Sequence, residues 1–253
     1  MTLLQSLILG IIQGATEFLP VSSSGHLLLA KKIFDLKEID NSFDIFLHFG
    51  TLVAVFIFFR KKIISILRGI LARDKDSIFF VLTILLASLP TALIGFLIEK
   101  NTGVFSSLIS LGISFLVTAS FLVIISMKKG GKGGVNLKSS FLVGTLQGLA
   151  AIPGISRSGS TIFAGIISGA SRRESFEFSF LVSVPAILGA NLLKVGDIFS
   201  GKVELLHLLS GGVLAFISGL FSLFFLEKTL VKGRLIIFSP YLLVLSILCF
   251  LFM

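Results

Sequence analysis

Long apolar runs separated by short basic segments make up most of this chain. A helix rises about 1.5 Å per residue, so a run of roughly 20 apolar residues crosses the hydrocarbon layer of a bilayer, which is about 30 Å thick. The pattern therefore predicts an all-α integral membrane protein. Its six runs of spanning length are 42–59, 76–98, 105–126, 175–195, 205–226 and 235–253.

Two further apolar stretches, 2–34 and 139–170, differ because proline, glycine and a cluster of serines interrupt each one midway. These residues end helices and favour turns, and the half-helices on either side are too short to cross a bilayer alone. Irregular backbone is tolerated at membrane depth only where it is buried in protein or faces water. Each stretch is thus predicted to be a re-entrant hairpin, which enters and leaves on the same side.

The two interrupted stretches are related as an internal repeat, in which GIIQGATEFLPVSSSGH (10–26) aligns with GTLQGLAAIPGISRSGS (144–160). The single domain 1–253 then divides into 1–126 and 127–253, each with one hairpin and three full spans. Because three crossings are an odd number, the two halves are predicted to have inverted topology. The identical pairs are Gly10 and Gly144, Gln13 and Gln147, Gly14 and Gly148, Ser22 and Ser156, Ser24 and Ser158, and Gly25 and Gly159.

The distribution of basic residues also predicts how the chain is oriented in the membrane. The chain has 22 Lys and Arg against 13 Asp and Glu, and in a membrane protein such an excess gathers in cytoplasmic loops rather than indicating a nucleic-acid partner. Both chain ends and the first hairpin are then predicted on the outer side, with the second hairpin on the inner side. Fifteen basic residues fall in the predicted inner segments 60–75, 127–138, 171–174 and 228–234, and six in the outer segments 31–41, 99–104 and 194–204.

Each hairpin turn is predicted to bind an anion. The returning half-helices begin at about 22–25 and 156–159, where unpaired backbone N–H groups and the positive end of the helix dipole face the turn. Two such ends that face each other near the midplane form an anion site. For any single serine, helix capping is the plainer interpretation. The predicted substrate-binding residues are Gln13, Ser22, Ser24, Gly25, Ser156, Ser158 and Gly159.

Charged side chains in these turns point to phosphate chemistry. Arg157 is expensive at membrane depth, which favours a functional role, and its guanidinium suits phosphate oxygens. Its alternative role is a structural ion pair with Glu17. Gln13 and Glu17 are four residues apart and share a helix face, so they are candidate ligands for a divalent cation, Mg²⁺ or Ca²⁺. The single Cys249 leaves neither a disulfide framework nor a thiolate metal site.

Histidine supplies a candidate base. Ser22 and Ser23 precede His26 by four and three residues, so the three side chains share a helix face. His26 is predicted to act as a base toward these hydroxyls, with burial against a neighbouring partner as its alternative. His48 and His207 stand inside long spans without such company, and they are predicted to pack or to form interhelical hydrogen bonds.

The motifs QGATEFLPVSSSGH and PGISRSG resemble the two signature stretches of the bacitracin-resistance-type undecaprenyl-pyrophosphate phosphatases. The resemblance covers the whole chain. It implies ten helices with two interlocking re-entrant hairpins in the bacterial cytoplasmic membrane. It also implies removal of the terminal phosphate of undecaprenyl pyrophosphate, which regenerates the carrier lipid of cell-wall synthesis.

The same resemblance implies site residues. The family's paired acids correspond to Gln13 and Glu17, its serine and histidine stretch to 22–26, and its arginine to Arg157. Many members have Glu where this chain has Gln13, which weakens a metal site built from two carboxylates. The predicted catalytic residues are Glu17, Ser23, His26 and Arg157.

The expected reaction starts when the pyrophosphate of a polyprenyl lipid enters between the turns from the outer face. Ser23 would attack the terminal phosphorus while His26 or Glu17 takes its proton, with attack by an activated water as an alternative. A secondary transporter or flippase of an anionic lipid is the competing function, because inverted repeats recur in transporters. A purely structural membrane protein leaves Arg157 unexplained. A homodimer is compatible with the sequence.

Overall fold

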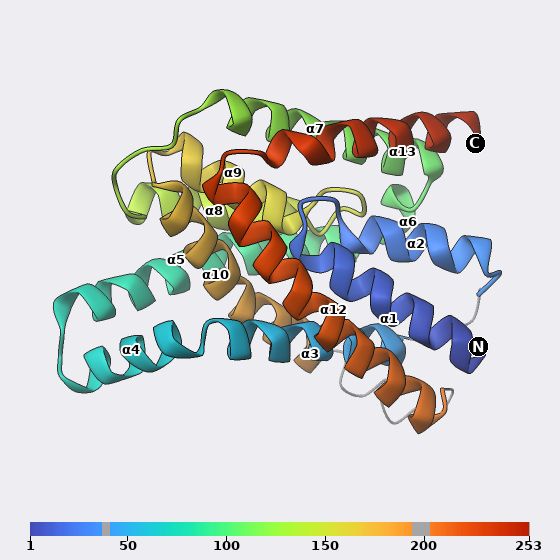
Figure 1. The fold of residues 1–253 in the computed structure, drawn as a ribbon, viewed down its shortest axis with the longest axis horizontal. Helices are drawn as coiled ribbons and strands as arrows, with labels where there is room; N and C mark the ends of the chain where they lie inside the picture. Colours follow the sequence, from blue (N-terminus) through green and yellow to red (C-terminus); the bar gives the residue numbers. More distant parts are fainter. Residues whose placement is uncertain (37–40, 194–202, 253) are drawn as a thin grey trace.

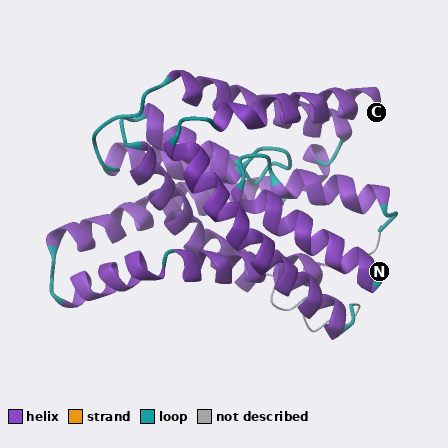
Figure 2. Ribbon diagram, viewed as in Figure 1, coloured by secondary structure: helices purple, strands orange, loops and turns teal. Residues whose placement is uncertain are grey.

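The structure, a computed structural model, describes residues 1–36, 41–193 and 203–252. Helices are the regular elements of this described part (Figures 1 and 2), so the all-α prediction is confirmed. The helices are α1 (Leu3–Phe18), α2 (Ser23–Ile33), α3 (Asn41–Phe58), α4 (Arg60–Leu71), α5 (Lys75–Glu99), α6 (Thr102–Phe105), α7 (Leu108–Met127), α8 (Leu137–Leu149), α9 (Arg157–Ile167), α10 (Arg172–Leu193), α12 (Leu205–Val231), the 3-10 helix η1 (Leu235–Phe238) and α13 (Ser239–Leu251).

Among the described residues, four helices, α5, α7, α10 and α12, are long and apolar enough to cross a membrane. A fifth span is formed if α3 and α4, which meet at a bend of 70°, are counted together. The chain is therefore a multi-pass integral membrane protein. The predicted spans 76–98, 105–126, 175–195 and 205–226 fall on the four long helices, and the predicted outer loop 194–204 lies largely outside the described residues.

Two predicted segments differ from the structure. The segment 60–75, predicted as a cytoplasmic loop, is mostly the helix α4, because its apolar residues Ile63, Ile66 and Ile70 recur at helical spacing. The predicted span 235–253 begins with the 3-10 helix η1, and the α-helix that follows has only 13 residues. Pro240 at the start of α13 explains this break, since its ring prevents an α-helix from continuing through it.

Both interrupted stretches are helix–turn–helix units. The first consists of α1 and α2, the second of α8 and α9. In Figure 1, α1 and α2 approach from the side that holds both chain ends, whereas α8 and α9 approach from the opposite side, and the two turns meet in the middle of the molecule. The turns need unusual backbone: Ser22 has φ of 71° and Gly154 has φ of 93°.

Each hairpin packs on a long helix from the other part of the chain, α1 along α12 and α8 along α5. Glycines permit the close approach. A Cβ atom at Gly10 would lie 2.4 Å from the backbone oxygen of Gly211, and one at Gly144 would lie 2.0 Å from that of Ala87. Gly10 and Gly144 are equivalent in the repeat alignment, so equivalent residues make equivalent helix contacts.

The hydrophobic core lies directly beside the two turns. Phe18, at the end of α1, is buried and packs edge-on against Phe180 of α10, with ring centroids 5.5 Å apart. Phe115 of α7 and Ile162 of α9 are also fully buried in this cluster. Because these side chains surround the polar turns, the turns are held on a packed apolar support.

Candidate active site

Hydrogen bonds tie the two turns to each other. Ser22 Oγ accepts from the backbone N–H of Gly154, at 3.1 Å, and Ser158 Oγ donates to the backbone oxygen of Leu19, at 3.2 Å. Thr118 of α7 anchors the second turn further, since its hydroxyl donates to Gly154 and accepts from the N–H of Ser156. The predicted meeting of the two turns is therefore present, with bonds running in both directions.

Serines cap both returning half-helices. Ser22 Oγ accepts from the N–H of Gly25, at 3.4 Å, and Ser156 Oγ accepts from that of Gly159, at 3.1 Å. The positive φ of Ser22 is unfavourable for a residue with a side chain, and its bonds to both turns hold it there. The capping interpretation thus applies to Ser22 and Ser156, and both helix N-termini point into the region between the turns.

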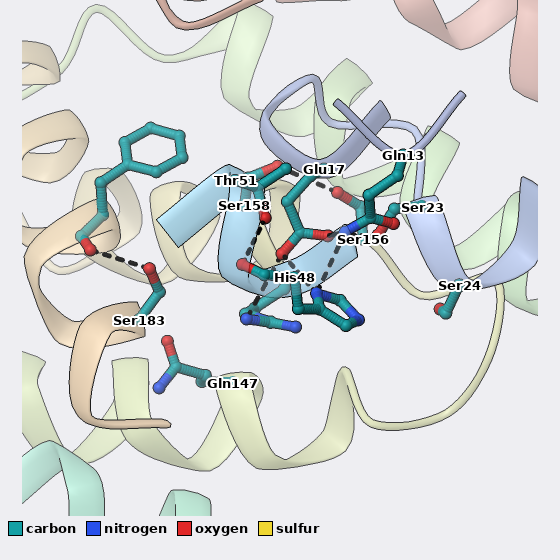
Figure 3. Close-up of polar contacts among 12 residues, drawn as sticks. Gln13, Glu17, Ser23, Ser24, His48, Thr51, Gln147, Ser156, Ser158 and Ser183 are labelled. Atoms are coloured by element: carbon teal, nitrogen blue, oxygen red, sulfur yellow. Dashed lines mark hydrogen bonds and ion pairs between the residues drawn. The ribbon is translucent and has the colours of Figure 1, made fainter. Parts of the chain in front are cut away.

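Glu17 stands at the centre of the site. Its Oε2 atom accepts from Ser23 Oγ, at 2.5 Å, and from Gln13 Nε2, at 3.1 Å (Figure 3). Its Oε1 atom lies 3.5 Å from Nη1 of Arg157, which comes from the second turn. The structure thereby brings the predicted residues Gln13, Glu17, Ser23 and Arg157 into one cluster.

His26 does not join this cluster through the contacts that the sequence predicted. Its Nδ1 atom lies 2.7 Å from the backbone oxygen of Ser22, and its Nε2 atom 2.6 Å from the hydroxyl oxygen of Tyr241. The ring also stacks on Tyr241 and meets the edge of Phe115. Both ring nitrogens are engaged elsewhere, so the expected contact of His26 with the hydroxyl of Ser22 or Ser23 is absent, and the hydroxyl of Ser23 donates to Glu17 instead.

His48 belongs to the site, although no sequence motif indicates this. It makes the predicted kind of interhelical hydrogen bond, but its partner belongs to the site: its Nδ1 atom lies 3.0 Å from Gln13 Nε2 and 3.8 Å from Glu17 Oε1. The only local signal was an imidazole inside an apolar span. His207 lies apart from this cluster, near the start of α12, with its Nδ1 atom 3.8 Å from Glu204.

A cavity opens beside the carboxylate and the guanidinium, between α1, α9 and α10. Hydroxyl groups and two phenylalanine rings share its wall, and Figure 3 shows Ser158 and Ser183 on this side of the cluster. Arg157 lines this cavity, and its side chain is 29% exposed, whereas that of Glu17 is 4% exposed. The lining residues are Glu17, Phe18, Arg157, Ser158, Thr161, Ser179, Phe180 and Ser183.

Glu17 and Gln13 offer oxygen atoms that suit a cation bound jointly by the protein and by oxygen atoms of a substrate. Within the described residues, no group of three or more His, Cys, Asp or Glu side chains could hold a metal ion. Gln13 Oε1, however, is buried without a hydrogen-bond partner, on the amide whose Nε2 atom donates to Glu17. One carboxylate and one amide oxygen match the way Mg²⁺ binds through few protein ligands together with phosphate oxygens.

Comparison with known proteins gives full-length matches. The family model described as "Bacitracin resistance protein BacA" matches residues 6–248. Among curated proteins, the undecaprenyl-diphosphatase of Desulfosudis oleivorans is 42% identical over 261 residues, which covers 96% of both chains. That of Thermosipho melanesiensis is 41% identical over 96% of this chain and 97% of its own. That of Borrelia hermsii is 39% identical over 98% of both.

Proposed function

The chain belongs to the bacitracin resistance protein BacA family and is an undecaprenyl-diphosphatase, and we propose that the two helix turns together form its active site. The observation that carries this proposal is the contact of Glu17 with both hairpins. Its carboxylate holds the hydroxyl of Ser23 from its own hairpin and faces the guanidinium of Arg157 from the other hairpin. The relatives' shared name favours hydrolysis over the competing transporter function.

Ser23 is the nucleophile of the proposed reaction. Its oxygen attacks the terminal phosphorus of undecaprenyl diphosphate, the bridging P–O bond breaks, and undecaprenyl phosphate leaves. The serine proton passes to Glu17 Oε2, which already accepts that hydrogen at 2.5 Å. Water then attacks the phosphoserine, inorganic phosphate leaves, and the proton returns to Ser23. Glu17 rather than His26 is thus the base.

Positive groups surround the position where charge develops. Arg157 offers its exposed N–H groups to the phosphoryl oxygens, and the N-termini of α2 and α9 add backbone N–H groups and dipoles. Glu17 and Gln13 Oε1 would hold Mg²⁺ or Ca²⁺ together with substrate oxygens, and such an ion supplies further charge neutralisation. Neutralising the diphosphate is the main requirement of phosphoryl transfer.

An inverted repeat explains this arrangement. The proposed halves are 1–126 and 127–253, with a re-entrant hairpin in each, and the equivalent packing of Gly10 and Gly144 supports them. Figure 1 also places both chain ends at one side of the molecule. The basic segments lie toward the opposite side, which is the cytoplasmic one by the positive-inside rule. The first hairpin then opens the site toward the outer face.

The test is phosphate release from a polyprenyl diphosphate by purified protein in detergent. Ser23→Ala and Glu17→Gln are each expected to lower kcat by about a hundredfold or more, since nucleophile or base is lost. Ser120→Ala removes an exposed hydroxyl that bonds only its own helix, and it serves as the matched control. Acid quenching with substrate labelled in the terminal phosphate is expected to trap phosphoserine in the unmodified protein. Undiminished activity of Ser23→Ala excludes the covalent route.

A further inference from the structure

The amide nitrogen of Gln13 joins His48 to the catalytic carboxylate. Gln13 is completely buried on α1, and its Nε2 atom lies 3.1 Å from Glu17 Oε2 and 3.0 Å from His48 Nδ1 (Figure 3). An amide nitrogen has two hydrogens, so it can donate to both partners at once. Both donations require His48 Nδ1 to be an acceptor, which assigns the imidazole hydrogen to Nε2.

Glu17 and His48 together favour one of the two orientations of this amide. The opposite rotation would bring Gln13 Oε1 against the carboxylate oxygen of Glu17, which can only accept, so it replaces that hydrogen bond with repulsion between lone pairs. The terminal torsion of a glutamine side chain is broad when nothing fixes it. With an acceptor on each side, from Glu17 and His48, the nitrogen is held between them.

The orientation of the amide bears directly on the nucleophile. Oε2 of Glu17 accepts from Gln13 and from Ser23 at the same time, so both donors fix the orientation of the carboxylate. If the amide turns away, the carboxylate loses a donor and can rotate relative to the serine hydroxyl. Misplacement of a reacting group by about 1 Å can lower a rate about a hundredfold.

The backbone that carries His48 is held firmly. Thr51 Oγ1 donates to the backbone oxygen of His48, at 2.9 Å. Two residues beyond His48 along α3, a Cβ atom at Gly50 would lie only 2.1 Å from the backbone oxygen of Gly212, so α3 and α12 are in close backbone contact there. An imidazole on such a support can orient a neighbour, because supporting groups work best on rigid elements.

We propose that His48 is a positioning residue for hydrolysis, which acts through Gln13 to hold Glu17 against Ser23. The inference rests on the proposed function of the site. His48 needs neither to touch the lipid nor to change its protonation state, and its contribution is the acceptor that it presents to one amide hydrogen.

Substitutions at position 48 test whether His48 acts as a hydrogen-bond acceptor or only fills space. His48→Leu fills space without accepting a hydrogen bond, and it is expected to lower kcat about tenfold to a hundredfold while KM changes less than about twofold. His48→Gln presents an amide oxygen to the same N–H and is expected to recover most of the activity. His207→Leu, on another helix and outside the cluster, is the matched control, and thermal unfolding in detergent checks that each variant is folded.

A double-mutant cycle tests the route through Gln13. Gln13→Leu is expected to lower kcat at least as much as His48→Leu, since it also removes the Oε1 cation ligand, and the double variant is expected to lose little more than Gln13→Leu alone. The inference is overturned if His48→Leu keeps the original kcat, if His48→Gln recovers nothing, or if the two losses multiply. The Ser23→Ala variant keeps the two proposals apart: an active Ser23→Ala removes the proposed nucleophile, whereas an inactive one beside a fully active His48→Leu removes only the positioning role.

Discussion

Nη1 of Arg157 lies 3.5 Å from Oε1 of Glu17, so a cation on α9 and a carboxylate on α1 meet where the two helix turns touch. Within a membrane protein, each of these charges is costly alone, and each lowers the cost of the other. The pair is unequal: the Glu17 side chain is 4% exposed and that of Arg157 is 29% exposed. Arg157 therefore compensates the buried base while part of its side chain remains accessible.

Substitution of Arg157 tests this double role. Arg157→Ala is expected to lower kcat/KM for the lipid diphosphate about a hundredfold or more, since it removes charge stabilisation at the phosphoryl group. Arg157→Lys keeps the charge but not the planar fork, so an intermediate value is expected. Phosphate release measures both, with the 76% exposed Arg173 changed to Lys as control. An Arg157→Lys variant as active as the unmodified protein contradicts the role of the fork.

Tyr241 is expected to orient His26. Tyr241→Phe keeps a ring for the stack but removes the hydrogen bond to His26 Nε2, at 2.6 Å. A net hydrogen bond contributes about 1 kcal/mol, so a fall in kcat/KM of about fivefold is expected. Unchanged phosphate release in Tyr241→Phe would contradict a contribution of this hydrogen bond to the site.

Removal of divalent cations is expected to stop phosphate release, and added Mg²⁺ or Ca²⁺ to restore it. Gln13→Glu places a second carboxylate beside Glu17, so it is expected to lower the cation concentration needed for half-maximal activity. Activity titrated against free cation measures this. Full activity in excess chelator contradicts the cation proposal and leaves the contact between Ser23 and Glu17 untouched.

Gly14→Ala is expected to disturb both stability and activity. A Cβ atom at Gly14 would lie 2.3 Å from the backbone oxygen of Ala215 and 2.6 Å from the backbone nitrogen of Gly219, so α1 would have to move away from α12. Overpacking of this kind costs about 1–3 kcal/mol. Thermal unfolding in detergent measures the loss. Gly95→Ala is the control, since a Cβ atom at Gly95 meets nothing within 4 Å; equal unfolding temperatures for both variants would refute the close contact.

The sequence predicts those parts of the fold that depend on local signals. Proline, glycine and serine mark both helix breaks, and Ser22 and Ser156 cap the helices that follow. Because the pattern occurs twice, the sequence also predicts a pair of hairpins. Equivalent glycines in the two hairpins then make equivalent close contacts. The cluster of Glu17, Ser23 and Arg157 could be anticipated from the same alignment, since two facing turns bring their polar residues together.

The remaining site depends on contacts between distant segments. Helical spacing places His26 on the same face as Ser22 and Ser23, but a ring can rotate, and the backbone oxygen of Ser22 and the hydroxyl of Tyr241 take its nitrogens. His48 comes from a helix that carries no motif, and its contact with Gln13 depends on how α3 packs against α12. No local pattern encodes either partner.

The turns of the two hairpins touch and form one site, and a disulfide between them is the sharpest test of this contact. The Cβ atom of Pro20 lies 3.4 Å from the place of a Cβ atom at Gly159, near the separation of about 3.8 Å that a disulfide requires. In a Cys249→Ser background, Pro20→Cys with Gly159→Cys is expected to lose nearly all maleimide-reactive thiol on mild oxidation. Pro20→Cys with Gly95→Cys is expected to keep it. Equal retention of thiol in both pairs would contradict the account.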